Sequence, residues 1–270
     1  MLAQQWRTFI IWSSPSKANT IVMFSLEEKK ILIVGATSDI GESTAMKCAK
    51  LGGELFLSGR NLDKLQQFSA QVKEANPKSQ VATGVCDLMS EESIVGFVEK
   101  LPRLDGIVFV AGTLKTLPCK LQQMQDVMEA FEVNFNAIVL MMATLMRLKK
   151  VNKGASIIFI SSVAGNLLAE KGNSLYGASK AALSAYAKTL ALELAGRKIR
   201  VNSMVLGMVK TKFLKSFALD EENFALDEAK YPLGYGAPDD VSGGVVFLLS
   251  DESRWVTGTN LLMDGGRTLH

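Results

Sequence analysis

The residues best suited to chemistry lie in one short stretch, "YGASKAAL", which begins at Tyr176. Tyr176 and Lys180 are four residues apart, so on a helix their side chains share one face and their polar ends can meet. A tyrosine with its ordinary pKa of about 10 is a poor acid–base catalyst at neutral pH, but a neighbouring ammonium favours the phenolate. We therefore expect Lys180 to lower the pKa of Tyr176. The spacing alone is common and fits a surface tyrosine beside a lysine at least as well.

Two polar residues upstream favour a functional role for Tyr176 and Lys180 over the surface interpretation. Ser162 ends the apolar run "SIIFISS", and Asn134 interrupts an otherwise apolar helical stretch. A serine at a strand end can simply cap a turn, whereas an asparagine among apolar residues needs a partner or a function. Four such residues on one sheet are hard to explain as independent accidents, so together they indicate a single site.

The elements that must position these residues alternate between short apolar runs and longer helical stretches from Lys29 onward. This order is typical of repeated βαβ units with right-handed crossovers. The runs are apolar throughout, which indicates strands covered on both faces. We predict one α/β domain over residues 23–270, a doubly wound parallel β-sheet with helices on both faces (a Rossmann fold). Its seven predicted strands are "ILIVG" at 31, "ELFLSG" at 54, "QVATGVCD" at 80, "GIVFVAG" at 106, "SIIFISS" at 156, "IRVNSMV" at 199 and "NLLMD" at 260.

Ligands bind such sheets at the carboxyl ends of the strands, where Gly35 and Gly41 bracket a strand-to-helix turn. The first glycine allows a tight turn, and the second allows close packing while the helix N-terminus faces an anion. Asp39 puts a negative charge in this turn. We expect Asp39 to tolerate a left-handed backbone and to cap the helix, pointing away from a diphosphate and leaving the Ile40 N–H for the cofactor.

The end of the second strand favours NADP(H) over NAD(H). A fold that binds NAD usually offers an acid there to the ribose, whereas this chain offers Arg60. An arginine can form two hydrogen bonds to a 2′-phosphate, although it would also suit an ordinary exposed loop. NAD(H) remains the alternative cofactor.

With these motifs in place, the chain resembles the short-chain dehydrogenase/reductase family from about Phe24 to Gly266, including 3-oxoacyl-carrier-protein reductases. The resemblance rests on the glycine turn, Asp87-Leu88, "AG" at 111, Asn134, Ser162, Tyr176, Lys180, "IRVNSMVLGMVKT" at 199 and "MDGG" at 263. It implies that Tyr176 donates and accepts the proton and that Ser162 holds the substrate oxygen. It also implies that Lys180 grips the nicotinamide ribose and that Asn134 anchors a water of the proton relay.

The resemblance also implies a set of cofactor contacts, in which Asp87 and Leu88 meet the adenine. The full set is Gly35, Thr37, Ser38, Asp39, Ile40, Gly41, Arg60, Asp87, Leu88, Ala111, Gly112, Tyr176, Lys180, Gly207, Val209 and Thr211. The chain departs from the family where Phe109-Val110 replaces a pair of asparagines, and we expect apolar repacking there. One extra residue also separates Ser162 from Tyr176, which would enlarge the loop beside the substrate.

The predicted function is an NADP(H)-dependent oxidoreductase that interconverts a carbonyl and a secondary alcohol. Hydride arriving at a carbonyl carbon builds negative charge on oxygen, which Ser162 can stabilise and Tyr176 can discharge. Two alternatives are a non-catalytic NADP(H)-binding regulator on the same fold and an NAD-dependent alcohol dehydrogenase. A small ketone, a sugar-like carbonyl and a hydroxyacyl group all fit as substrate, and the resemblance implies a homotetramer or a homodimer.

Composition excludes several other classes of protein. The only histidine is His270, which makes a Ser-His-Asp triad or a histidine-built zinc site improbable, so we predict no metal. Three scattered cysteines suggest no disulfide framework, and a net charge of +3 is too small to imply nucleic acid. We found no apolar run of about 18 residues, so we expect no membrane segment and a cytoplasmic location.

Two segments stand apart from the βα rhythm. Residues 1–22 show no periodicity, and we expect them to form an extension outside the fold. Residues 210–238 lack a strand and contain the near-repeat "FALDEEN" and "FALDEAK". We expect a lid over the site there, the alternative being an accidental duplication in a pair of surface helices. Its acidic residues would repel an acidic carrier protein.

Overall fold

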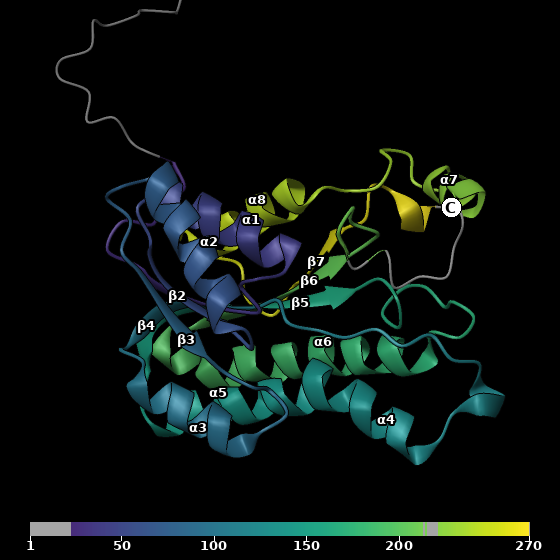
Figure 1. Cartoon of the computed structure of the whole chain (residues 1–270), viewed down its shortest axis with the longest axis horizontal. Coiled ribbons are helices and arrows are strands. Elements are labelled where there is room, and N and C mark those ends of the chain that lie inside the picture. The colour runs from purple at the N-terminus through teal and green to yellow at the C-terminus, as the bar shows by residue number, and fades with distance from the viewer. Residues whose placement is uncertain (1–22, 213, 215–220, 270) are drawn as a thin grey trace, which may run out of the picture.

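A computed structural model describes residues 23–212, 214 and 221–269, in which seven parallel strands form one sheet (Figure 1). The strand order is β3-β2-β1-β4-β5-β6-β7, as expected for a doubly wound fold. All seven predicted strands are confirmed, at β1 (Lys30–Val34), β2 (Glu54–Gly59), β3 (Val81–Val85), β4 (Leu104–Phe109), β5 (Val151–Ser162), β6 (Arg200–Leu206) and β7 (Asn260–Met263). Continuous burial explains the apolar composition of the central strands, since Ile31 to Val34 are at most 1% exposed. The expectation of cover on both faces is wrong for the edge strands β3 and β7, in which every residue is partly or fully exposed.

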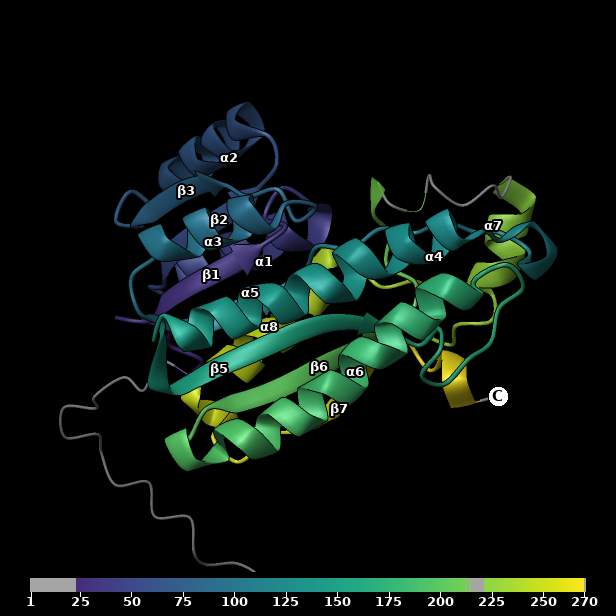
Figure 2. The same ribbon diagram turned by 90° about the horizontal axis from the view of Figure 1, so that it is seen from below.

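Helices cover both faces of the sheet, so the core is divided into two layers (Figure 2). One layer is built on α1 (Asp39–Lys50), α2 (Leu62–Ala75) and α8 (Pro238–Leu249). The other is built on α3 (Glu91–Lys100), α5 (Ala137–Arg147) and α6 (Ser174–Leu194), with α4 (Met124–Phe131) extending along α6. The prediction of one Rossmann-type domain is therefore confirmed.

The order of the strands reverses between β1 and β4, which pair in parallel. Val34 lies opposite Ser58 on one side and Phe109 on the other, so the three strands end at one edge. The residues that follow these strands therefore meet in one crevice, and that crevice is where a doubly wound sheet binds its ligand.

Apolar repacking at Phe109 is confirmed. Its ring is 1% exposed and stacks on Phe159, with ring centroids 5.2 Å apart and an interplanar angle of 24°. Two aromatic rings on neighbouring strands thus fill the space that polar side chains would occupy.

A continuous helical stretch from Met124 to Arg147 is long and apolar enough, by length and composition alone, to cross a membrane. The search for an apolar run in the sequence missed it. Core helices of soluble proteins pass the same test. Here α5 packs against α3, and Met141, Met142 and Leu145 are fully buried in the core. The α5 part of the stretch therefore packs within the fold, whereas Met124 and Met128 of the α4 part are exposed.

The predicted extension 1–22 lies outside the described residues, as do residues 213 and 215–220 of the predicted lid. The described remainder of the lid contains α7 (Glu221–Glu228). An ion pair between Lys210 and Glu228 at 2.7 Å joins α7 to the segment that follows β6. The first copy of the near-repeat falls largely outside the described part. Closure of this segment over the site stays a prediction.

Candidate active site

A cavity of about 550 Å³ opens at the carboxyl ends of the central strands. It brings together nearly every residue that the sequence singled out. Gly41 and Asn134 are the two exceptions among them, and both stand directly behind the cavity wall. The predicted residues that line it are Gly35, Thr37, Ser38, Asp39, Ile40, Arg60, Asp87, Leu88, Ala111, Gly112, Ser162, Tyr176, Lys180, Gly207, Val209 and Thr211.

The turn after β1 requires glycine at two positions. Gly35 has φ +88°, and a Cβ there would lie 2.7 Å from the Ala111 nitrogen. A Cβ at Gly41 would lie 2.4 Å from the Gly35 oxygen. The main chain therefore forms a bare cradle at the N-terminus of α1, which suits a diphosphate.

Ser38, not Asp39, caps α1. The Ser38 hydroxyl accepts from the Gly41 N–H at 3.2 Å and donates to the Gly35 carbonyl at 2.8 Å. Asp39 is the first residue of the helix and does not adopt a left-handed backbone. The prediction of an Asp39 cap is wrong because the adjacent serine already fills that role.

The Asp39 carboxylate instead binds Lys212, which lies beyond β6. It accepts from the Lys212 backbone N–H at 2.5 Å and forms an ion pair with its ammonium at 3.1 Å. The hydrogen bond that the Lys212 ammonium donates to Asp39 is the main cause of the raised pKa of Lys212. The negative charge in the glycine turn is therefore matched by a positive charge from another segment.

The residues predicted to meet the adenosine part of the cofactor line the cavity after β2 and β3. Arg60 follows β2 and lines the cavity there, while the neighbouring Asn61 caps α2 by accepting from the Lys64 N–H at 2.9 Å. Asp87 and Leu88 line the wall after β3. A guanidinium at this position offers a planar fork of donors, which suits a phosphate on the ribose.

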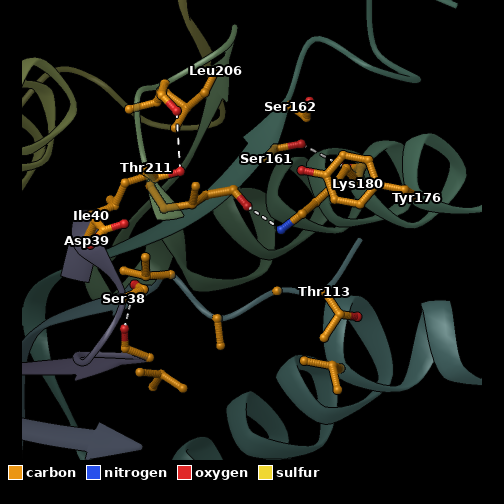
Figure 3. Close-up of a pocket in the computed structure, with 18 of the residues that line it drawn as sticks. Ser38, Asp39, Ile40, Thr113, Ser161, Ser162, Tyr176, Lys180, Leu206 and Thr211 are labelled. Carbon is orange, nitrogen blue, oxygen red and sulfur yellow. Dashed lines mark hydrogen bonds between the residues drawn. The ribbon is translucent and has the colours of Figure 1, made fainter. Parts of the chain in front are cut away.

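Tyr176 and Lys180 project from α6 into the same space, as Figure 3 shows. The Lys180 ammonium lies 5.9 Å from the centre of the Tyr176 ring and donates to the Ile160 carbonyl at 2.9 Å. One helical turn separates the two residues, so the predicted shared face is realised.

Burial, however, dominates the pKa values of both groups. It raises the pKa of Tyr176 to about 12, although a hydrogen bond with Ser162 opposes the rise. Burial also lowers the pKa of Lys180 to about 8. The expected net lowering of the tyrosine pKa is thus wrong for this pocket, because removing the phenolate from water outweighs the hydrogen bond with Ser162.

Ser162 and Tyr176 are held together by the main chain. Gly165 has φ +80°, and a Cβ there would lie 2.1 Å from the carbonyl oxygen of Gly177. The chain just after Ser162 therefore lies directly on the first turn of α6. Asn166 secures the same loop by donating to the Ser162 carbonyl at 2.8 Å.

Asn134 lies in a π-helical turn (Glu132–Asn136) between α4 and α5. Its side chain accepts from the Thr113 N–H at 2.8 Å and donates to the Thr113 carbonyl at 2.9 Å and the Ser179 hydroxyl at 3.0 Å. A Cβ on Gly112 would lie 3.2 Å from Asn134 Oδ1 and 3.0 Å from the Lys180 ammonium. Asn134 thus positions the end of β4 beside Lys180. The predicted role of Asn134 in binding a water of the proton relay stays a prediction.

Sequence reasoning missed several residues on the wall of this cavity. Glu170 and Asn173 come from the loop before α6, and Met208, Leu214 and Tyr231 from the segment after β6. The extra residue between Ser162 and Tyr176 was the one sequence signal near them. Within the described ranges, no group of three or more potential ligands that could hold a metal ion occurs.

Known reductases and dehydrogenases resemble this chain over most of its length. Residues 35–268 match the family described as enoyl-(acyl carrier protein) reductase. The chain is 33% identical over 249 residues to 3-oxoacyl-[acyl-carrier-protein] reductase FabG from Rickettsia felis, covering 90% of this chain and 98% of the relative. It is 30% identical over 248 residues to a glucose 1-dehydrogenase from Gluconobacter oxydans, covering 90% and 92%.

Solved structures agree with the sequence relatives. A short-chain type dehydrogenase/reductase from Mycobacterium marinum superposes with a TM-score of 0.85 at 27% identity, covering 92% of this chain and 98% of that one. A dehydrogenase/reductase from Sinorhizobium meliloti gives 0.83 at 29% identity, covering 90% and 96%. The named relatives act on different substrates, so likeness alone does not identify the substrate of this chain.

Proposed function

Because this chain belongs to the short-chain dehydrogenase/reductase family, we propose that it interconverts a carbonyl and a secondary alcohol with NADP(H), using Tyr176 as general acid and base. One observation carries the proposal. Ser162, Tyr176 and Lys180 converge on one wall of a cavity whose opposite end begins at the glycine turn.

The cofactor fits the residues that line this cavity. The bare main chain at Gly35 and the N-terminus of α1 would hold the diphosphate, and Lys180 would hold the nicotinamide ribose. When bound, the nicotinamide supplies hydride to the substrate carbon or accepts it. Arg60 supports the preference for NADP(H), because β2 ends without an acidic side chain that could accept from ribose hydroxyls.

The protein's own residues manage the charge and the proton. The Ser162 hydroxyl stabilises negative charge as it develops on the substrate oxygen, and the Tyr176 hydroxyl then donates its proton to that oxygen. With its pKa raised to about 12, Tyr176 stays protonated at neutral pH. This state suits the reduction direction, in which the group must begin as an acid.

The test is an activity screen of the purified protein with NADPH and with NADH on a panel of ketones. We expect turnover with NADPH to exceed turnover with NADH, and Arg60→Ala to remove most of that preference. Tyr176→Phe should keep its affinity for NADPH and lose about 10²- to 10⁴-fold in turnover, the usual contribution of a general acid.

Other outcomes would favour the alternatives. Tight NADPH binding without oxidation on any carbonyl would support a non-catalytic regulator. Faster turnover with NADH would support an NAD-dependent alcohol dehydrogenase, and substantial activity in Tyr176→Phe would reject the assigned acid.

We also propose that the protein is a homotetramer, with a homodimer as the alternative. The apolar side chains of Met124 and Met128 on α4 are 73% and 59% exposed, and a second copy of the chain would cover them. Light scattering at several concentrations tests the assembly. The cytoplasmic location stays a prediction that cell fractionation can test.

A further inference from the structure

Two consecutive residues near the end of β5 hold Lys180 at both of its ends. The Ile160 carbonyl accepts from the Lys180 ammonium at 2.9 Å. The Ser161 hydroxyl donates to the main-chain carbonyl of Lys180, also at 2.9 Å. Figure 3 shows Ser161 beside Lys180 on the wall of the cavity. The strand therefore holds the charged end of the lysine through one bond and the base of its side chain through the other.

The Ser161 hydroxyl uses its full capacity for hydrogen bonding. Besides donating to Lys180, it accepts from the Asn166 amide at 3.1 Å and from the Ser184 hydroxyl at 2.8 Å. A hydroxyl offers one donor and two acceptor positions, so all three are occupied. Ser161 and Ser184 are at most 3% exposed, so bulk water has little access to these bonds. The hydroxyl cannot rotate without losing a partner.

These partners link the Ser161 hydroxyl to both sides of the assigned catalytic group. Asn166 donates from the same amide nitrogen to Ser161 and to the Ser162 carbonyl, the latter at 2.8 Å. On the other side, Ser184 lies one helical turn beyond Lys180 on α6. Ser161 thus connects the strand end that carries Ser162 to the helix that carries Lys180.

Two other buried serines make comparable hydrogen bonds away from the site. Ser156, earlier on β5, donates to the Leu248 carbonyl of α8 at 2.6 Å. The Ser203 hydroxyl, on β6, lies 3.2 Å from that of Ser184. Both serines are at most 1% exposed, and neither belongs to the described wall of the cavity. They match Ser161 in burial and chemistry, while their hydrogen bonds go to other residues.

We propose that Ser161 is a positioning residue for the proposed reaction, which holds the main chain of Lys180 in place relative to Ser162. The inference rests on the proposed function, because it concerns the alignment of the same catalytic groups. Without the Ser161 hydroxyl, α6 is free to shift against β5, and the base of the Lys180 side chain shifts with it. A misplacement of about 1 Å can reduce turnover about 10²-fold.

The experiment compares Ser161→Ala with Ser156→Ala and Ser203→Ala. Each change removes one buried hydroxyl from a hydrogen-bonded pair, so denaturant unfolding should show similar losses of stability in all three proteins. Titration with NADPH counts the folded binding sites in each preparation. Expressing kcat per NADPH-binding site then separates a defect in alignment from a loss of folded protein.

We expect kcat per site to fall about tenfold in Ser161→Ala, as a shift of a fraction of an ångström would cause, and to stay near the wild-type value in the two controls. KM for the fastest ketone of the panel should change by less than about twofold, because alignment acts on the transition state. Kd for NADPH, measured by fluorescence titration, should rise about threefold in Ser161→Ala alone, since Lys180 holds the ribose through a hydrogen bond.

The outcomes distinguish this inference from the proposed function. Equal kcat per site in the three serine variants overturns the inference and leaves the proposed function standing. A wild-type protein that reduces no carbonyl with either cofactor overturns both. If Ser161→Ala fails to fold, Asn166→Ala on the partly exposed loop removes the amide that orients the Ser161 hydroxyl. Wild-type kcat per site in that variant overturns the inference, whereas a fall with unchanged KM supports it.

Discussion

Gly112→Ala tests how closely the catalytic groups are fitted around the strand end after β4. An added Cβ would lie 3.0 Å from the Lys180 ammonium and 3.2 Å from Asn134 Oδ1, whereas 3.4 Å is ordinary contact. The neighbours must therefore move by about 0.2–0.4 Å to restore ordinary contact.

The two neighbours differ in how freely they can move. Asn134 is fixed by three hydrogen bonds to Thr113 and Ser179. Lys180 is the flexible end of a long chain held by one bond to the Ile160 carbonyl. We therefore expect Lys180 to absorb the shift and to lengthen that bond.

We expect kcat with saturating NADPH to fall about tenfold, since a misplacement of about 1 Å can reduce turnover about 10²-fold. The free energy of unfolding should change by only about 1 kcal/mol, because the strain of the new methyl group is partly offset by the lower chain entropy of alanine in the unfolded state. Turnover and denaturant unfolding measure the two effects separately.

Gly96→Ala on α3 is the matched control. A Cβ there meets nothing within 4 Å, so activity should be unchanged and stability should rise by up to about 1 kcal/mol. Wild-type turnover in a folded Gly112→Ala protein would refute the idea that this glycine sets the position of Lys180.

Two further predictions concern charge. Asp39→Asn should leave the Lys212 ammonium unpaired above the glycine turn and lower the Kd for NADPH about threefold at low salt, with the gain lost at high salt. Weaker binding at low salt would instead mean that the carboxylate organises the turn. The pKa of Lys180, lowered to about 8 by burial, should make reductive kcat/KM fall above pH 8 as the ammonium that holds the ribose is lost. The descent should disappear in Lys180→Arg, and its survival there would assign it to another group. Because the folded pKa lies below the ordinary value of 10.5, the unfolded chain binds more protons between about pH 8 and 10.5, and the contribution of Lys180 to stability rises with pH in that window.

The fold could be predicted from the sequence because its signals are local. Each buried strand is a short apolar run, and each run appears at its expected place in the sheet. The same holds for Tyr176 and Lys180, whose spacing on a helix determines that they share a face. Glycine at positions 35 and 41 likewise follows from the turn itself, through the positive φ of Gly35 and the contact of Gly41 with the turn backbone.

The helix cap, the partner of Asp39 and the pKa of Tyr176 could not be predicted from the sequence, because they depend on distant contacts and on burial. Ser38 and Asp39 are both good caps, and only the backbone decides which one begins the helix. The partner of Asp39 is 173 residues away. The raised pKa of Tyr176 reflects the depth of the pocket, about which a four-residue spacing says nothing.

Glu170 and Asn173 were missed for a related reason. Neither belongs to a spacing motif, and only the path of the loop between β5 and α6 brings them to the cavity wall. Ser161 is next to a predicted catalytic serine, but its hydrogen bonds to Lys180 and Ser184 form only in the folded chain.

The main-chain contact between Gly165 and Gly177 has a consequence for protein engineering. Because backbone touches backbone at Gly165, and Asn166 secures the chain just after Ser162, these contacts hold Ser162 near Tyr176 before the loop reaches Glu170. The loop can then be redesigned around Glu170 as an exchangeable recognition module, while the chemical step remains with the rigid frame on either side. Substrate range and catalytic power become separate design variables in this scaffold.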